Sequence, residues 1–431
     1  MRSFFFRSAA QRLAFLSLLV TPAVACSLIN SLDDVKAQLE SDSGPGGDDG
    51  GDLDAADGST GTPKGAIVIG GLAESDGGSE PVLTALAPED GSELPLARKR
   101  MTVAGIQYDG ARDLWYVFES GGATYFPLPT DPVTLHVMTL DTHTGAWATL
   151  QSLRVPTLES FTHATVLNER LVYVAYRSGG NTATDRDLIT VNTSDPSNVV
   201  VTDRQELAAP VLGILGTRGA SAGGTLNLLS YLTCGADAGA QCLQIQQLTV
   251  AANAAPTFGI SKPYGEIFGS PGFAATANSG NLLAFKTPLG GTKADIRVFD
   301  PRTLTDIGDP IPFNSNDSYL KPMAIAECLG QALVIGTNQE LSVYAVPLQA
   351  ADGRQANART QHSGQGVYFE PYTSTVLAPF SQSDSFDLTA MRLTGDKKNP
   401  ALTLRQTDWK PAPIRPEIVA TRTPVPFACP E

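Results

Sequence analysis

The stretch LWYVFESGGATYFPLPTDPVTLHVMTLDTHTGAW, from Leu114 to Trp147, carries the pattern that decides the fold. It opens with the apolar run Leu114–Phe118, which is typical of a strand buried on both faces. After a connection, Leu135–Leu140 alternates between apolar and polar residues, as expected of a second strand. A turn rich in Asp, Thr and Gly comes next. The stretch therefore predicts two short strands and the turn that leads to a further one.

The same order of apolar run, alternating strand and polar turn recurs along the chain after Lys64. The last apolar residue before each turn falls at 86, 140, 191, 250, 299, 346 and 393, which are 47 to 59 residues apart. A period near 50 with four short strands per unit is typical of a β-propeller. Residues 65–431 are therefore predicted to form an all-β domain, a seven-bladed propeller, with six or eight blades as alternatives. We expect Glu417–Phe427 to complete the first blade and close the ring.

Composition agrees with many short strands joined by turns. Of the 431 residues, 41 are Gly and 30 are Pro, while charged residues make up only 17%. This composition disfavours a helical bundle or a coiled coil. The 30 Lys and Arg against 44 Asp and Glu give a net charge of −14, without the basic footprint of a nucleic-acid binder.

The first 25 residues have the form of an export signal. Arg2, Arg7 and Arg12 precede the apolar run Leu13–Val20, which is too short to span a bilayer. The following sequence, Ala23-Val24-Ala25-Cys26, resembles the bacterial lipobox, with Ala in place of the commoner Leu at its first position. The resemblance implies cleavage before Cys26 and lipid attachment to its thiol. The alternative is an ordinary signal peptide cut after Ala25, which would leave Cys26 unmodified.

Residues 26–64 are predicted to be a tether. Positions 41–62 are almost only Gly, Asp, Ser, Thr, Ala and Pro, a composition that cannot bury enough apolar surface to fold. The Asp residues between 48 and 57 lack the spacing of an EF-hand loop, so we expect a solvated spacer and no calcium site. The tether holds nine acidic residues and two Lys, a charge of −7, so much of the acidity lies outside the predicted propeller.

Three segments resemble the motifs of kelch-type propellers. Leu140–Trp147 matches the D-x-x-T-G-x-W turn through Asp141, Thr144, Gly145 and Trp147. The resemblance implies that the Asp and Thr cap the turn and that the Trp packs between blades. Phe299–Leu304 repeats the turn without the Trp, and Leu167–Val174 resembles the kelch strand pair, with Glu169 where Gly is usual. The kelch Gly doublet is mostly absent, so the resemblance implies a divergent propeller without a known ligand.

Four cysteines remain if Cys26 is lipidated, and this even number suits an oxidising compartment. Cys234 and Cys242 bracket a short loop and are expected to pair across a hairpin. Cys328 is expected in a strand of the sixth unit. It would then form a disulfide with Cys429 and so attach the C-terminal segment to the propeller. Four cysteines allow three connectivities, so the pairing stays a hypothesis. The chain has no C-x-x-C motif or His pair at ligand spacing, so we predict no metal site and no cofactor.

The candidates for catalysis are weak in sequence. Gly219–Gly223 matches the G-x-S-x-G nucleophile elbow around Ser221, with His362 downstream, but no strand–helix pattern surrounds it. His136 lies in an alternating strand and His143 in the kelch-like turn, where structural roles suit both. Paired carboxylates drawn from different blades stay open, because spacing along the chain gives no information on them.

The sequence favours a binding module over an enzyme. We expect an exported bacterial lipoprotein, anchored to the cell envelope through Cys26 and sorted towards the outer membrane, with a protein or glycan as partner. Long loops on rigid scaffolds often carry recognition. The longest ones predicted are Gly121–Thr134, Arg177–Asp187 and Ala350–Gly366. The alternative is a carbohydrate-active hydrolase or lyase, which a cluster of carboxylates, Arg or His in the central funnel would favour.

Overall fold

The computed structural model describes 65–75, 78–122, 127–177, 185–207, 211–217, 225–233, 241–250, 255–266, 273–275, 282–286, 293–314, 319–338, 340–348, 356–360, 366–382, 385–405 and 407–423. The chain divides into two units, residues 1–54 and 55–431, and the fold below is that of the second unit alone. The predicted boundaries of the signal peptide and the tether lie outside the described residues.

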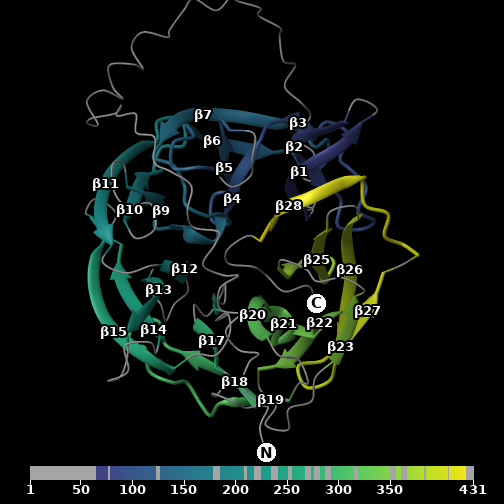
Figure 1. The fold of residues 1–431 in the computed structure, drawn as a ribbon. Coiled ribbons are helices and arrows are strands. Elements are labelled where there is room, and N and C mark those ends of the chain that lie inside the picture. The colour runs from purple at the N-terminus through teal and green to yellow at the C-terminus, as the bar shows by residue number, and fades with distance from the viewer. Residues whose placement is uncertain are drawn as a thin grey trace, which may run out of the picture. The chain divides into compact units, whose positions relative to one another are not determined.

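The described residues form seven four-stranded antiparallel sheets, here called blades 1 to 7 (Figure 1). Blade 1 contains, in spatial order, β28 (Ile414–Thr421), β1 (Ile67–Ser75), β2 (Gly78–Leu86) and β3 (Lys99–Arg100). Blade 2 contains β4 (Val103–Asp109), β5 (Leu114–Ser120), β6 (Val133–Leu140) and β7 (Trp147–Val155). Blade 3 contains β8 (Ala164–Leu167), β9 (Arg170–Tyr176), β10 (Arg186–Asn192) and β11 (Val200–Leu207).

The other four blades follow the same order along the chain. Blade 4 contains β12 (Val211–Thr217), β13 (Thr225–Thr233), β14 (Gln241–Thr249) and β15 (Thr257–Glu266). Blade 5 contains β16 (Phe273–Ala275), β17 (Leu282–Lys286), β18 (Lys293–Phe299) and β19 (Ile311–Asn314). Blade 6 contains β20 (Tyr319–Ala326), β21 (Gln331–Asn338), β22 (Glu340–Pro347) and β23 (Ala356–Thr360). Blade 7 contains β24 (Tyr368–Glu370), β25 (Thr375–Gln382), β26 (Ser385–Gly395) and β27 (Pro400–Leu404).

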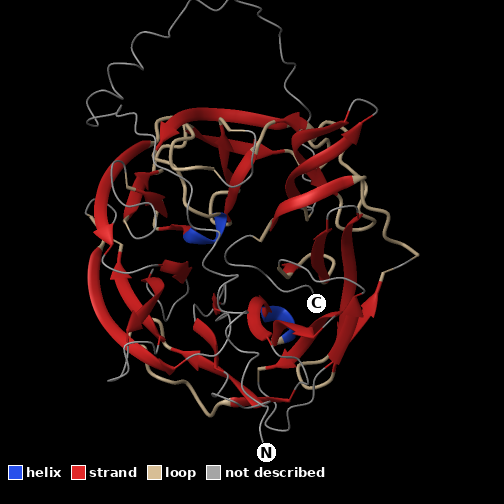
Figure 2. Cartoon of the chain, in the orientation of Figure 1, coloured by secondary structure: helices blue, strands red, loops and turns tan. Residues whose placement is uncertain are grey.

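The blades form a closed ring. The first strand of each blade contacts the first strand of the next, from β28 through β4, β8, β12, β16, β20 and β24 and back to β28. A series of contacts that returns to its start places these strands on the inner side of the ring, as Figures 1 and 2 show. The predicted all-β, seven-bladed propeller is therefore confirmed.

Helix is scarce in the part of the chain that the structure describes. It consists of two three-residue 3-10 turns, η1 (Phe161–His163) and η2 (Glu327–Leu329). Neither turn is long or apolar enough to cross a membrane.

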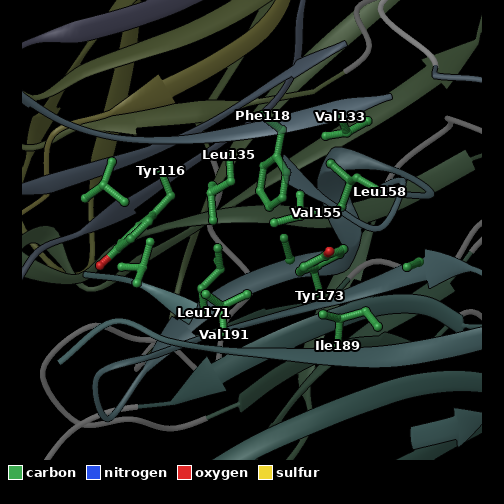
Figure 3. Close-up of a cluster of buried hydrophobic side chains, with 14 of the residues drawn as sticks. Tyr116, Phe118, Val133, Leu135, Val155, Leu158, Leu171, Tyr173, Ile189 and Val191 are labelled. Carbon is green, nitrogen blue, oxygen red and sulfur yellow. The ribbon is translucent and has the colours of Figure 1, made fainter. Parts of the chain in front are cut away.

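The core lies between neighbouring blades. Tyr116 and Phe118 of β5 pack against Leu171 and Tyr173 of β9 (Figure 3). The rings of Phe118 and Tyr173 meet edge to face with centroids 5.2 Å apart, a favourable geometry for aromatic pairs. The opposite face of β5 packs towards blade 1 through residues such as Trp115. Burial of both faces explains why the second strands are almost continuous apolar runs.

The ring closes through the C-terminal strand. β28 pairs antiparallel with β1, from Ile67 opposite Thr421 to Ala73 opposite Ile414. It thereby supplies the innermost strand of blade 1, whose other strands come from the start of the domain. The predicted closure is confirmed, although the strand begins and ends earlier than Glu417–Phe427.

A cluster of polar side chains beside β28 fixes this closure. The Arg422 guanidinium donates two hydrogen bonds to the Asp113 carboxylate, at 2.9 and 2.6 Å, and a third to the Tyr372 hydroxyl at 3.1 Å. The Tyr108 hydroxyl donates to the same carboxylate at 2.7 Å. Burial raises the pKa of Asp113, but the bonds from Arg422 and Tyr108 outweigh it and hold the pKa below its ordinary value. The cluster ties blades 1, 2 and 7 together.

The turn after β6 joins blade 2 to blade 1. Thr144 Oγ1 donates to Asp141 Oδ2 at 2.6 Å, and Gly145 has a φ of +80° that favours glycine. Trp147 Nε1 donates to the carbonyl oxygen of Ala97 in blade 1 at 2.7 Å. A Cβ on Gly145 would lie 2.6 Å from the Cβ of Leu94, so the close approach of the two blades also requires glycine here.

The structure corrects one expectation about local conformation. Cys328 lies in the 3-10 turn η2 between β20 and β21, and not in a strand. It is disulfide-bonded, and Cys429, its predicted partner, lies outside the described residues. Glu169 has a φ of +57° in the β8–β9 hairpin, the left-handed region that costs a non-glycine residue roughly 1–2 kcal/mol. The hairpin thus keeps the backbone of a glycine turn without the glycine.

We expect Arg422→Ala to lower the free energy of unfolding by about 1–3 kcal/mol, because hydrogen bonds to charged groups at a mostly buried site are lost. Urea unfolding of the full chain measures the change. The control is Arg302→Ala, whose guanidinium is half exposed and lies 4.0 Å from Asp300, with an expected change below about 0.5 kcal/mol. Equal effects of the two substitutions would contradict a closing role for Arg422.

Candidate functional site

The ring has two faces with different connections. One, the turn face, carries the turns between first and second strands and between third and fourth strands. Arg112 in the β4–β5 turn donates to Thr193 after β10, so turns of both kinds lie together. The other, the loop face, carries the connections between second and third strands and between blades. There Thr157, between blades, donates to the Asp131 carbonyl oxygen before β6 at 2.8 Å.

Two of the three predicted recognition loops begin and end on the loop face, in neighbouring blades. The β5–β6 connection is 121–132 and the β9–β10 connection is 177–185, so Thr134, Arg186 and Asp187 belong to strands. The third prediction, Ala350–Gly366, is wrong as a single loop, because β23 occupies its middle. Most of the remainder of that stretch lies outside the described residues.

The root of the 121–132 connection is held by hydrogen bonds. Gly121 N donates to the Pro132 carbonyl oxygen at 2.8 Å, which closes the base of the connection. Leu128 N donates to Asp131 Oδ2 at 2.7 Å, and Asp131 N donates back to the Leu128 carbonyl oxygen at 2.9 Å. The Leu128 side chain is 61% exposed, so this fixed backbone presents an apolar group to solvent.

The root of the 177–185 connection is an ionic network on blade 3. The buried Asp187 carboxylate accepts a hydrogen bond from Arg177 Nε at 2.9 Å and another from Arg204 Nε. Arg177 also donates to Glu206 Oε1 at 2.7 Å. The Asp187 carboxylate therefore holds the guanidinium groups of Arg177 and Arg204 in place. Without this carboxylate, two positive charges would lie side by side.

A second cluster lies beside this network, at the same end of blade 3. Glu159 Oε1 is 2.6 Å from Arg186 Nε, and its Oε2 is 3.7 Å from His163 Nδ1. The Arg186 guanidinium stacks over the Tyr176 ring at 4.6 Å. The turn η1, which ends at His163, contacts the innermost strands β4 and β12. The cluster therefore lies near the inner side of the ring, on the loop face.

The charge of Glu159 is set by its two partners. Burial raises its pKa, but His163 and Arg186 outweigh that effect and hold the pKa below its ordinary value. Glu159 is therefore an anion near neutral pH. An ionised carboxylate beside an imidazole and a guanidinium can hold both groups in place, and an imidazole held in this way can transfer protons.

Sequence reasoning did not find this cluster. The sequence holds four His, and His163, like Glu159 and Arg186, lies in no recognisable motif. Glu159 comes from the connection between blades and Arg186 from the start of a third strand, 27 positions later in the sequence. The bridge between Leu158 and Ala175 places Glu159 beside β9, and the antiparallel pairing of β9 with β10 sets Arg186 opposite Tyr176.

The other predicted site residues are dispersed or not described. Cys26, Cys234, Cys429, Ser221 and His362 lie outside the described residues, and Cys242 lies in β14. Asp141, Thr144, Gly145 and Trp147 lie together on the turn face, far along the strands from the loop roots. Among the described residues, no group of three or more His, Cys, Asp and Glu is placed to hold a metal ion.

No protein-family model and no curated protein matches the sequence. Solved structures share the fold. A candidate 6-phosphogluconolactonase from Bacteroides fragilis matches with a TM-score of 0.54 and 11% identity, over 85% of this chain and 99% of its own. One from Bacteroides uniformis matches with a TM-score of 0.53 and 11% identity, over 83% and 99%. A functionally unknown protein from Desulfotomaculum acetoxidans matches with a TM-score of 0.50 and 11% identity, over 79% and 99%. At such identities the likeness establishes the fold alone.

We expect the stabilising effect of Glu159 to depend on pH. A carboxyl group with a lower pKa in the folded than in the unfolded chain stabilises the fold above its unfolded value and loses this as pH falls. The difference in unfolding free energy between wild type and Glu159→Gln should therefore be larger near pH 7 than below the ordinary value of 4.5. Urea titrations of both proteins across this range measure it, and a difference that does not change with pH would contradict the assignment.

Proposed function

We propose that this chain is an exported, lipid-anchored envelope protein whose propeller binds a protein or glycan partner on its loop face. The observation that carries the proposal is the pair of long connections, 121–132 and 177–185, in neighbouring blades, each fixed at its root. Fixed roots on a rigid scaffold lower the entropy lost when a loop binds, and such loops often carry recognition.

The anchor part of the proposal rests on the lipobox-like segment that ends at Cys26. Two or three acyl chains, at roughly 0.8 kcal/mol per buried CH2, would hold the protein stably at a membrane. A tether of 39 residues would let the propeller reach partners away from the surface.

Metabolic labelling with a fatty acid tests the anchor. In a bacterial host we expect wild type to incorporate label and to sediment with membranes, and Cys26→Ala to do neither, because the acceptor thiol is gone. Label on Cys26→Ala, or none on wild type, would overturn the anchoring mechanism while leaving the binding proposal untouched.

A matched pair of exposed leucines tests which face binds. Leu128 is 61% exposed on the loop face, and Leu96 is 64% exposed in the β2–β3 connection of the turn face. We expect Leu128→Glu to weaken capture of partners from envelope extracts at least tenfold and Leu96→Glu to leave it unchanged. The immobilised protein is wild type or one variant, and quantitative mass spectrometry is the readout. Loss with Leu96→Glu alone, or with neither variant, contradicts the proposed face.

The second candidate function is a hydrolase on the same scaffold. The Glu159–His163–Arg186 cluster favours it, because a carboxylate, an imidazole and a guanidinium lie together near the inner side of the ring. Two of the structures that share the fold carry the name of a candidate 6-phosphogluconolactonase. Turnover of a sugar lactone or a glycoside by wild type, lost in Glu159→Gln, would decide for this candidate.

A further inference from the structure

A row of three polar side chains crosses blade 2, apart from the loop roots and the Glu159 cluster. His136 on β6 is central: its Nδ1 lies 2.8 Å from Ser152 Oγ on β7, and its Nε2 lies 2.8 Å from Glu119 Oε2 on β5. Ser152 is directly opposite His136 in the strand register, and Glu119 is diagonal to it. The row has the connectivity of a nucleophile, a base and an orienting carboxylate.

The directions of the hydrogen bonds follow from the carboxylate. An ionised carboxylate only accepts hydrogen bonds, so the bond to Glu119 places the imidazole proton on Nε2. In the neutral imidazole, Nδ1 then carries the lone pair and accepts the hydroxyl proton of Ser152. This tautomer is the one that can remove a proton from Ser152, and Glu119 would stabilise the imidazolium that results.

The row is accessible because blade 1 covers this flank incompletely. Glu119, His136 and Ser152 share the face of blade 2 that is turned to blade 1, the face that also carries Val117 and Met138. The outermost strand of blade 1, β3, has two residues, whereas β7 has nine. Ser152 is exposed, and the side chains of His136 and Glu119 are 15% and 35% exposed to solvent. Arg154, two residues along β7 and hence on the same face, adds a positive charge.

We propose that Ser152 is an activated nucleophile that reacts with small activated esters, with His136 as its base and Glu119 as the residue that orients His136. In the acylation step Ser152 Oγ attacks the ester carbonyl carbon and its proton passes to His136 Nδ1. The new Oγ–C bond forms as the bond to the leaving alkoxide breaks, and the imidazolium proton passes to that alkoxide. Water then hydrolyses the acyl-serine by the same route, which releases the acid.

A fluorophosphonate probe tests the nucleophile directly. Ser152 Oγ would form a bond to phosphorus while fluoride leaves, so the label stays on the protein. We expect stoichiometric labelling of the wild-type chain on Ser152, located by peptide mass spectrometry, and none on Ser152→Ala. His136→Ala should slow labelling by about 100-fold or more, the usual contribution of a general base. Glu119→Gln should slow it less.

The matched control is Ser197→Ala, since Ser197 Oγ donates to the Asp195 carboxylate at 2.7 Å and has no imidazole partner in that bond. It should label like wild type. Label that persists in Ser152→Ala, or a wild type that stays unlabelled, overturns the proposal. Thermal unfolding of each variant separates loss of reactivity from loss of fold.

A thiol at the same position gives a second measure that does not depend on the probe. In Ser152→Cys, His136 should favour the thiolate, so alkylation by iodoacetamide should be at least tenfold faster than in Ser152→Cys/His136→Ala. Equal rates would show that His136 does not activate the side chain at position 152 and would overturn the proposal.

Discussion

The pairing of β28 with β1 is the constraint on which the rest of the structure depends. It joins the two ends of the folded part, from Ile67 with Thr421 to Ala73 with Ile414. Bringing two strands so distant in sequence together costs conformational entropy, and this cost precedes the contacts that offset it. Because β4 and β24 both contact β28, the neighbouring blades on either side take their positions from this strand. The Arg422 cluster spans the same three blades, at the place where the two ends of the domain meet.

Around the rest of the ring, uncharged amide side chains join one blade to the next. Their carbonyl acceptors lie at or near the turns of the following blade, where a buried C=O group without a partner would be costly. The bonds run from Gln151 to Val199, from Gln205 to Pro256, from Gln247 to Pro301 and from Gln331 to Asp396. An amide satisfies a carbonyl without placing a charge between apolar sheets.

The sequence was sufficient for the architecture because a blade is a local unit. Six of the apolar second strands and the turn after each third strand could be placed from their own residues. The Glu159–His163–Arg186 cluster could not be predicted from the sequence, because it depends on how a connection between blades folds back onto β9. The contacts of His136 could not be predicted either. An alternating strand predicts which face a side chain lies on, but not which side chains of the two neighbouring strands it meets. Between Ala350 and Gly366, polar composition concealed β23.

Closure by the last strand also explains where the molecule can carry chemistry. Blade 1 is assembled from both ends of the domain, and its outermost strand pairs with β2 at only Val82 and Leu83. The flank of blade 2 is therefore less covered than a flank between two complete blades, which leaves the row at Ser152 open to solvent. Turns on the turn face are committed to blade-to-blade bonds, as Trp147 and Arg112 illustrate. On the loop face, the roots of the connections 121–132 and 177–185 are bonded within their own blades. The turn face thus holds blade-to-blade bonds, the loop face carries the roots of two long connections, and the flank of blade 2 beside blade 1 carries the exposed Ser152.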